Sequence, residues 1–129
     1  MTITFPNGSQ RVWAFDRTRK WSNASGIVTL TEYTQATNNI DVQGTNRFGN
    51  TFTNTVVAPI ASNGDHLSCY FLPYQGELQH QVGSRTATIT FGTNSTGTPN
   101  GSPTVCGGGF YIAYQNASNG VSANRYVPY

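Results

Sequence analysis

The chain has 129 residues, seven of which are Lys or Arg and five Asp or Glu, so its formal net charge is only +2. This length favours a single domain over residues 1–129, large enough to form its own core without a metal or disulfide. So small a charge gives no electrostatic reason to expect nucleic-acid or membrane binding. No apolar run approaches the ~18 residues that a membrane-spanning helix needs, which predicts no membrane span.

Uncharged polar residues and glycine dominate the composition. Asn, Thr, Ser, Gln and Gly account for 62 of the 129 residues. Charged side chains usually keep a small domain soluble. A chain with so few must therefore present an uncharged hydrogen-bonding surface or bury much of its surface against partners. This composition favours a protein that works by contact rather than by chemistry.

Nine segments show the residue pattern of β-strands. The clearest is Thr86–Phe91, in which Ala87, Ile89 and Phe91 alternate with threonines, as expected for a half-buried strand with one threonine face. The other segments are also rich in β-branched or aromatic residues. In chain order the nine expected strands are Thr2–Phe5, Gln10–Asp16, Ile27–Thr31, Asn39–Gln43, Asn50–Ile60, Leu67–Tyr74, Thr86–Phe91, Gly109–Tyr114 and Arg125–Tyr129.

Turn-forming residues separate these segments. The pairs Asn7-Gly8 and Asn63-Gly64 are typical of tight hairpins, in which successive residues adopt positive φ. Other clusters of Asn, Gly, Ser and Thr also tolerate turn geometry. They predict further turns at residues 22–26, 45–50 and 116–120.

The same pattern predicts an all-β fold with little or no helix. Good helix formers are scarce, with four Leu, two Glu and one Lys, and Gln75–Val82 is the only place for a short helical turn. About eight short strands predict a single-domain antiparallel β-sandwich or jelly roll, or else a small barrel. Residues Gly92–Gly109 form a long polar loop, and loops of this length usually bind something or move.

Cations and large aromatics are concentrated near the N-terminus. The segment Arg11–Trp21 holds four of the seven basic residues and both tryptophans. This mixture suits single-stranded nucleic acid, whose phosphates bind cations and whose bases stack on rings. It equally suits sugars, which lie on Trp while polar groups reach their hydroxyls, and the structural alternative is an edge strand with core aromatics and a solvated turn. The binding candidates are Arg11, Trp13, Asp16, Arg17, Arg19, Lys20 and Trp21.

The C-terminal quarter is rich in tyrosine and ends on an aromatic residue. Tyrosine-rich, lysine-poor surfaces are typical of protein interfaces. An apolar end also predicts docking, either within the domain or onto a neighbour. Because tyrosine suits half-buried strand positions, a purely structural role is the alternative. The interface candidates are Tyr111, Tyr114, Tyr126 and Tyr129.

Acid–base candidates are few. His66, Glu77, His80 and Arg85 are the residue types of a phosphodiester hydrolase, in which one group removes a proton, another returns it and a cation holds the phosphate. Their spacing matches no motif that we can assign. An enzyme is therefore the least favoured reading.

Metal, cofactor and disulfide signals are weak. Cys69 and Cys106 could form one disulfide, but spacing alone does not show that they meet. Free buried thiols are slightly favoured, because the N-terminus has no secretory signal. No loop concentrates carboxylates at calcium-ligand spacing, and the histidines supply too few neighbouring zinc ligands. We expect no metal and no cofactor.

Three classes of function remain. The favoured one is a non-enzymatic, self-assembling structural or surface protein, such as a phage or virus particle subunit, a decoration protein or an appendage component. Its partner is then itself, with nucleic acid as a further partner of the basic segment, and its place is the exterior of a virion or cell, otherwise the cytoplasm. The second class is a carbohydrate-binding module or lectin with Trp13 or Trp21 as stacking platform. The third is a small hydrolase or nuclease.

Overall fold

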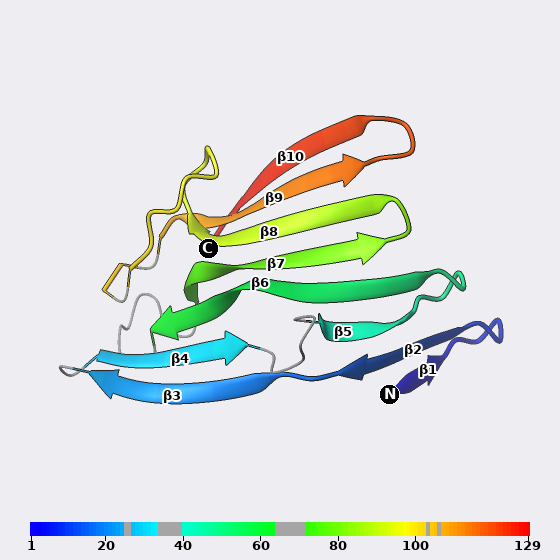
Figure 1. Cartoon of the computed structure of the whole chain (residues 1–129), viewed down its shortest axis with the longest axis horizontal. Helices are drawn as coiled ribbons and strands as arrows, with labels where there is room; N and C mark the ends of the chain where they lie inside the picture. The colour runs from blue at the N-terminus through cyan, green and yellow to red at the C-terminus, as the bar shows by residue number, and fades with distance from the viewer. Residues whose placement is uncertain (25–26, 34–39, 64–71, 103, 106) are drawn as a thin grey trace.

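The computed structural model shows the chain as one antiparallel β-sheet (Figure 1). In the part of the chain that it describes, all regular structure is β and no helix occurs, which confirms the predicted all-β class. Accordingly, none of these residues belongs to a helix long and apolar enough to cross a membrane. The described residues are 1–24, 27–33, 40–63, 72–102, 104–105 and 107–129.

Ten strands build the sheet. Eight follow the hydrogen-bonded order β1-β2-β5-β6-β7-β8-β9-β10, while β4 pairs with both β6 and β3. In chain order the strands are β1 (Thr2–Thr4), β2 (Gln10–Phe15), β3 (Thr18–Ala24), β4 (Ile27–Tyr33), β5 (Ile40–Thr45), β6 (Thr51–Asn63), β7 (Pro73–Val82), β8 (Arg85–Thr93), β9 (Gly109–Asn116) and β10 (Val121–Pro128).

Strand β6 is the longest, with 13 residues, and it joins two parts of the sheet. Strand β7 pairs along one edge of β6, from Phe52 to Ser62. The other edge is shared, because β5 pairs with residues 51–55 and β4 with residues 60–63. The N-terminal part, β1–β5, and the C-terminal part, β7–β10, therefore lie on opposite sides of β6 (Figure 1).

Three of the predicted turns are confirmed. At residues 5–9 the Gly8 N–H donates to the Phe5 carbonyl over 2.9 Å. In the turn at residues 45–50 the Asn46 side chain accepts hydrogen bonds from the backbone N–H groups of residues 48 and 50. At residues 116–120 the Gly120 N–H donates to the Asn116 carbonyl. The Asn63-Gly64 pair is only half described, since Asn63 ends β6 and residue 64 lies outside the described residues.

Two local predictions are wrong. Residues 75–82, where the sequence allowed a helical turn, lie within β7, because their polar side chains pair across the sheet; Gln79, for example, lies between Thr55 and Thr88. Residues 17–20, a solvated turn in the structural alternative for this segment, lie mostly in β3, which pairs with β4. The sandwich or jelly roll is compatible with the sheet but stays a prediction, since all ten strands are joined in one sheet.

The pairing register gives the sheet two chemically different faces. One, called the apolar face below, carries the cross-strand row Val56, Leu78, Ile89 and Ile112. The opposite face, called the threonine face, presents neutral polar residues across six strands. One of its rows runs through Gln43, Thr53, Gln81, Thr86, Gln115 and Ser122.

Few apolar side chains are fully buried. Among the described residues these are Phe52, Val56, Ile60 and Ala61 on β6 and Tyr74 on β7. The rest of the apolar face, on β7, β8 and β9, is only half-buried. The chain exposes 7806 Å², whereas a compact monomer of 14.0 kDa exposes about 6,700 Å². The core therefore follows β6, and no second layer of described residues covers the remaining apolar face.

The aromatic C-terminus docks within the domain. This was one of the two alternatives predicted for it, the other being docking onto a neighbour. The Tyr129 hydroxyl donates to the Pro73 carbonyl and accepts from the Gly92 N–H over 3.3 Å. Its ring lies 6.2 Å from that of Phe110. These contacts tie the end of β10 to the ends of β7, β8 and β9.

Candidate functional site

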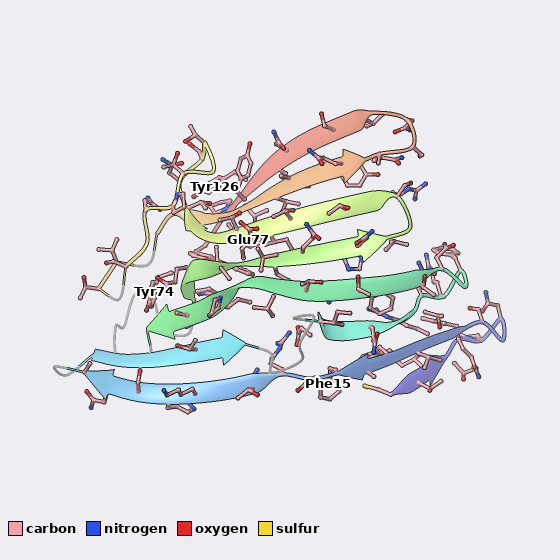
Figure 2. All side chains as sticks on the ribbon, in the orientation of Figure 1. Phe15, Tyr74, Glu77 and Tyr126 are labelled. Carbon is pink, nitrogen blue, oxygen red and sulfur yellow. The ribbon has the colours of Figure 1, made fainter. Side chains whose placement is uncertain are left out.

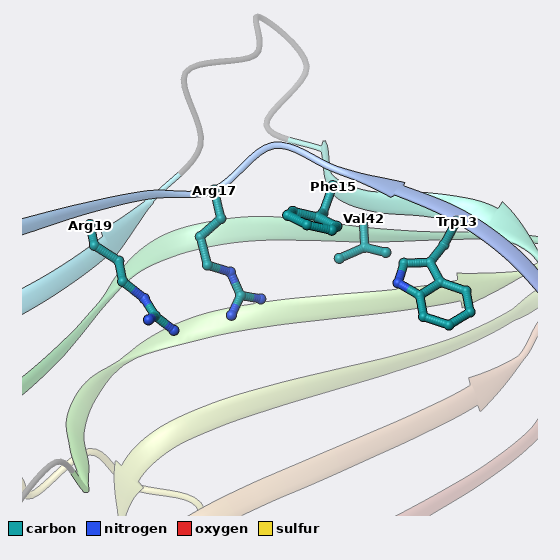
Figure 3. Close-up of a pocket in the computed structure, with 5 residues that line it drawn as sticks. All are labelled: Trp13, Phe15, Arg17, Arg19 and Val42. Carbon is teal, nitrogen blue, oxygen red and sulfur yellow. The ribbon is translucent and has the colours of Figure 1, made fainter. Parts of the chain in front are cut away.

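Strand β2 brings predicted binding residues together on the apolar face. Side chains alternate along a strand, so Arg11, Trp13 and Phe15 project from the same face of β2. The chain continues from β2 into β3, and further side chains project to the same side (Figure 3). The residues that line an open hollow of about 440 Å³ there are Trp13, Phe15, Arg17, Arg19 and Val42.

Arg11 connects this hollow to a second one. Its guanidinium lies 5.0 Å from the ring centroid of Trp13 in the first hollow and 5.4 Å from that of Phe52 in the second. The second hollow measures about 390 Å³, and we call the two together the arginine–aromatic surface. The second is lined by Phe5, Arg11, Asn46, Arg47, Phe48, Phe52, His80 and Val82.

The arginine–aromatic surface is positively charged. Four of the chain's six arginines line the two hollows, and none of the described residues that line them is Asp or Glu. One of these arginines, Arg17, binds the carboxylate of Asp41. Arg11 and Arg47 lie instead against aromatic rings. Positive charge and aromatic area therefore coincide.

An ion pair with a buried carboxylate fixes the arginine row to the sheet. Asp41 is 1% exposed, and Arg17 donates to both of its carboxylate oxygens, over 3.0 Å from Nε and 2.5 Å from Nη2. Asp41 occupies the extra position of a β-bulge, since Ile40 and Val42 pair with the consecutive residues 55 and 54 of β6. Bulges redirect side chains in this way. The bulge lets a carboxylate between two apolar neighbours point to Arg17.

Two phenylalanines on this surface are open to solvent. Phe15 is 68% exposed and Phe48 is 73% exposed, while Trp13 is half-buried beneath Arg11. Arg47 lies 4.7 Å from the ring centroid of Phe48. Single exposed apolar residues are common on proteins, but a contiguous group marks a binding surface more often.

His80 borders the second hollow as a neutral side chain. Its Nδ1 lies 2.6 Å from Asn54 Oδ1, and its ring centroid lies 5.8 Å from that of Phe52. Burial lowers the pKa of His80 below its usual 6.5, and the positive charge of Arg11 lowers it further. The imidazole therefore adds no positive charge to the surface at neutral pH.

The acid–base candidate Glu77 does not converge with His80. Glu77 is three residues from His80 on a regularly paired strand, so the two side chains project from opposite faces of the sheet. Glu77 Oε2 instead accepts from Thr90 Oγ1 over 3.5 Å. His66, Cys69 and Cys106 lie outside the described residues. Within the described ranges, no three His, Cys, Asp or Glu residues could hold a metal ion together.

Three predicted binding residues lie away from the hollows. Asp16 is exposed, and its N–H donates to the Asp41 carbonyl. Lys20 and Trp21 belong to β3, and Trp21 is 55% exposed. Neither hollow is lined by any of the three.

The predicted interface tyrosines are mostly half-buried. Tyr111 and Tyr126 are direct partners in the pairing of β9 with β10. The loop before β9 covers this pair, because Gly97 lies against the Tyr111 ring. Tyr114 belongs to the opposite, apolar face by strand alternation, and Tyr129 docks as described above.

Several residues of the arginine–aromatic surface lie outside the predicted binding segment. Arg47 and Phe48, in the turn between β5 and β6, are a cation and an aromatic side by side, and this pair could have been noted. Phe5 and Phe52 carry no such local signal, because only strand pairing brings them next to Arg11.

Comparison with known proteins adds no further assignment: no family model, no curated protein and no solved structure matches the chain.

Proposed function

We propose that the chain is a non-enzymatic structural subunit that assembles with copies of itself. The observation that carries this proposal is the apolar face of the C-terminal part. Its row of Leu78, Ile89 and Ile112 crosses three strands yet is only half-buried. A sheet with one apolar face is stable when that face packs against another layer. A second copy, facing the first, supplies such a layer.

The exposed area supports an interface of ordinary size. The chain exposes 7806 Å², about 1,100 Å² more than the ~6,700 Å² of a compact monomer of this mass. Each partner of a standard protein interface buries about 800 Å². If one second copy covered the apolar face, the solvent-exposed area of the chain would fall close to that of a compact monomer of the same mass.

The small number of charged residues supports a second copy of the chain as the partner. Only 12 of the 129 residues are charged, so two copies repel each other weakly. The threonine face offers neutral hydrogen-bonding groups for further contacts. These properties suit a subunit of a virus or phage particle, a decoration layer or an appendage, and hence a place on the exterior of a virion or cell.

Native mass tests the proposal. Light scattering after size exclusion should show a dimer or a larger species at micromolar concentration. Ile112→Lys, on the apolar face, should yield monomers that keep the β-sheet circular dichroism spectrum. Ala113→Lys, one residue away on the threonine face, is the matched control and should leave the assembly intact. A wild-type protein that stays monomeric at high concentration contradicts the proposal.

A carbohydrate-binding role has one observation in its favour. Trp21 is 55% exposed on β3, and an open indole ring is a common platform for sugars. Trp13 is less suited, because Arg11 lies over its ring. If the protein is a lectin, sugars should quench its tryptophan fluorescence, and Trp21→Leu should abolish the response while Trp13→Leu does not.

A further inference from the structure

We propose that the arginine–aromatic surface binds single-stranded nucleic acid. In this proposal Arg11 and Arg47 hold phosphates, and bases stack on Phe15 and Phe48. The surface lies on the same face of the sheet as the row that a second copy would cover, mainly over the N-terminal part, with His80 and Val82 of β7 at its edge. The proposal therefore goes beyond self-assembly, although the two surfaces are neighbours on one face of the sheet.

The guanidinium groups of Arg11 and Arg47 lie in positions that suit phosphate binding. The guanidinium of Arg11 lies 5.0 Å from the Trp13 ring centroid, and that of Arg47 lies 4.7 Å from the Phe48 ring centroid. Both arginines are exposed. A guanidinium held against a ring is planar and restricted in rotation, and its N–H groups can still reach a phosphate in pairs. The rings therefore pre-orient the cations.

The two phenylalanines provide stacking surfaces. Phe15 and Phe48 are 68% and 73% exposed; Arg47 lies over one face of the Phe48 ring, so a base would stack on its other face. Every base has a flat face that stacks on an aromatic ring, which makes such sites tolerant of sequence. The backbone beneath Phe15 is a paired strand, so its position is fixed before binding.

Other ligands fit this chemistry less well. Sugar hydroxyls need acceptors as well as donors, whereas arginine only donates hydrogen bonds and the described lining of the hollows contains no carboxylate. Duplex nucleic acid hides its base faces inside the stack. An acidic peptide would use the charge but leave the exposed phenylalanines without a partner. An unstacked strand uses both features.

Fluorescence anisotropy on the assembled wild-type protein tests the proposal. The probes are fluorescein-labelled oligothymidylate and oligouridylate of about 20 nucleotides, longer than the ~4–16 nucleotides of a typical site. Comparing the two probes shows whether DNA or RNA is preferred. Binding should weaken steeply as salt rises from about 50 to 200 mM, with a slope of about 0.7 per phosphate contact.

Variants separate stacking from charge. Phe15→Ala and Phe48→Ala should each weaken binding by about 5- to 150-fold, the range measured for loss of one stacked base. Arg47→Gln should weaken binding and reduce the salt slope by about 0.7. Arg125→Gln, an equal charge change on β10 in the C-terminal part, is the matched control and should alter neither.

Four results would overturn the proposal. They are no binding at low salt, equal affinity for duplex and single strand, equal losses in Arg47→Gln and Arg125→Gln, and competition by polyglutamate as strong as by oligothymidylate. The last result would point to an acidic protein partner. None of them bears on the native mass, so this proposal and the self-assembly proposal fail separately.

Discussion

The two sides of β6 use aromatic residues in opposite ways. In the C-terminal part, Phe91, Phe110 and Tyr129 lie against one another, with ring centroids 6.0 and 6.2 Å apart. In the N-terminal part, Phe15 stands open to solvent and Trp13 is in contact with a cation. Figure 2 labels Phe15 at one side of the sheet and Tyr126 at the other.

The difference follows from the strands that surround each group. Strands β7, β8 and β9 have 10, 9 and 8 residues and bring apolar rows into register. Strands β1, β2 and β5 have 3, 6 and 6 residues, which leaves few neighbours for a large ring. We infer that the C-terminal part carries the stability of the chain, and that the N-terminal part carries a binding surface held by the ion pair between Arg17 and the buried Asp41.

The largest expected effect is a loss of stability caused by a substitution in the C-terminal part. Gly92 has φ +66°, and a Cβ atom there would lie 1.7 Å from the Tyr74 carbonyl oxygen. Gly92→Ala should therefore lower the free energy of unfolding by more than about 3 kcal/mol or prevent folding. The control is Gly49→Ala in the N-terminal part, where φ is +79° but no atom lies within 4 Å. Its cost should be about 1 kcal/mol from backbone strain alone. Equal urea midpoints for the two variants would contradict this reading.

The second largest effect is expected from breaking the ion pair between Arg17 and Asp41 in the N-terminal part. Arg17→Ala leaves Asp41 buried without its partner and should cost about 3 kcal/mol in urea unfolding. The exposed Arg47→Ala should cost less than about 0.5 kcal/mol. The double variant Arg17→Met/Asp41→Leu should recover much of the loss, because no buried charge remains. If the double variant is as unstable as Arg17→Ala, the unpaired carboxylate is not the cause.

A smaller effect is expected at the C-terminal residue. Tyr129→Phe keeps the ring contact with Phe110 but removes the hydroxyl that bridges Pro73 and Gly92. The expected loss is about 1–2 kcal/mol, since the Gly92 N–H loses its acceptor. Tyr114→Phe is the control, because the Tyr114 hydroxyl makes no hydrogen bond to a described residue. Thermal unfolding of both variants measures the difference.

The smallest effect concerns pH. The pKa of His80 is lowered by burial and by Arg11, so below pH 6.5 the unfolded chain binds more protons than the folded chain. Stability should therefore be constant above about pH 6.5 and fall as the pH drops below it. His80→Gln should flatten this fall. Arg11→Gln should raise the pKa of His80 in an NMR titration, whereas Arg125→Gln should not change it.

Part of the molecule follows from local sequence. The alternation in Thr86–Phe91 predicts β8 and its two faces, and both features are present in the structure. The turn at residues 45–50 was predicted from Asn and Gly, which supply its hydrogen bonds. Residues 75–82 were harder to predict as a strand, because a run of Gln and Glu carries no strand signal of its own. This segment is a strand because it pairs with β6 and β8.

The candidate site was predicted only where its residues are adjacent in sequence. Arg11, Trp13 and Arg17 stand out as a cluster in the chain, and the structure places all three beside the hollows. Asp41 and Phe52 gave no such signal, because Asp41 depends on a bulge and Phe52 on the pairing of β5 with β6.

Composition and periodicity alone determined an all-β chain with a neutral polar exterior, since strand alternation and helix propensity are local properties of the residues. Only the tertiary structure decided that all ten strands join one sheet, that one face is apolar and half-covered, and that four arginines gather around aromatic rings. These features depend on which strands pair and in which register, and pairing is set by contacts between residues far apart in the chain.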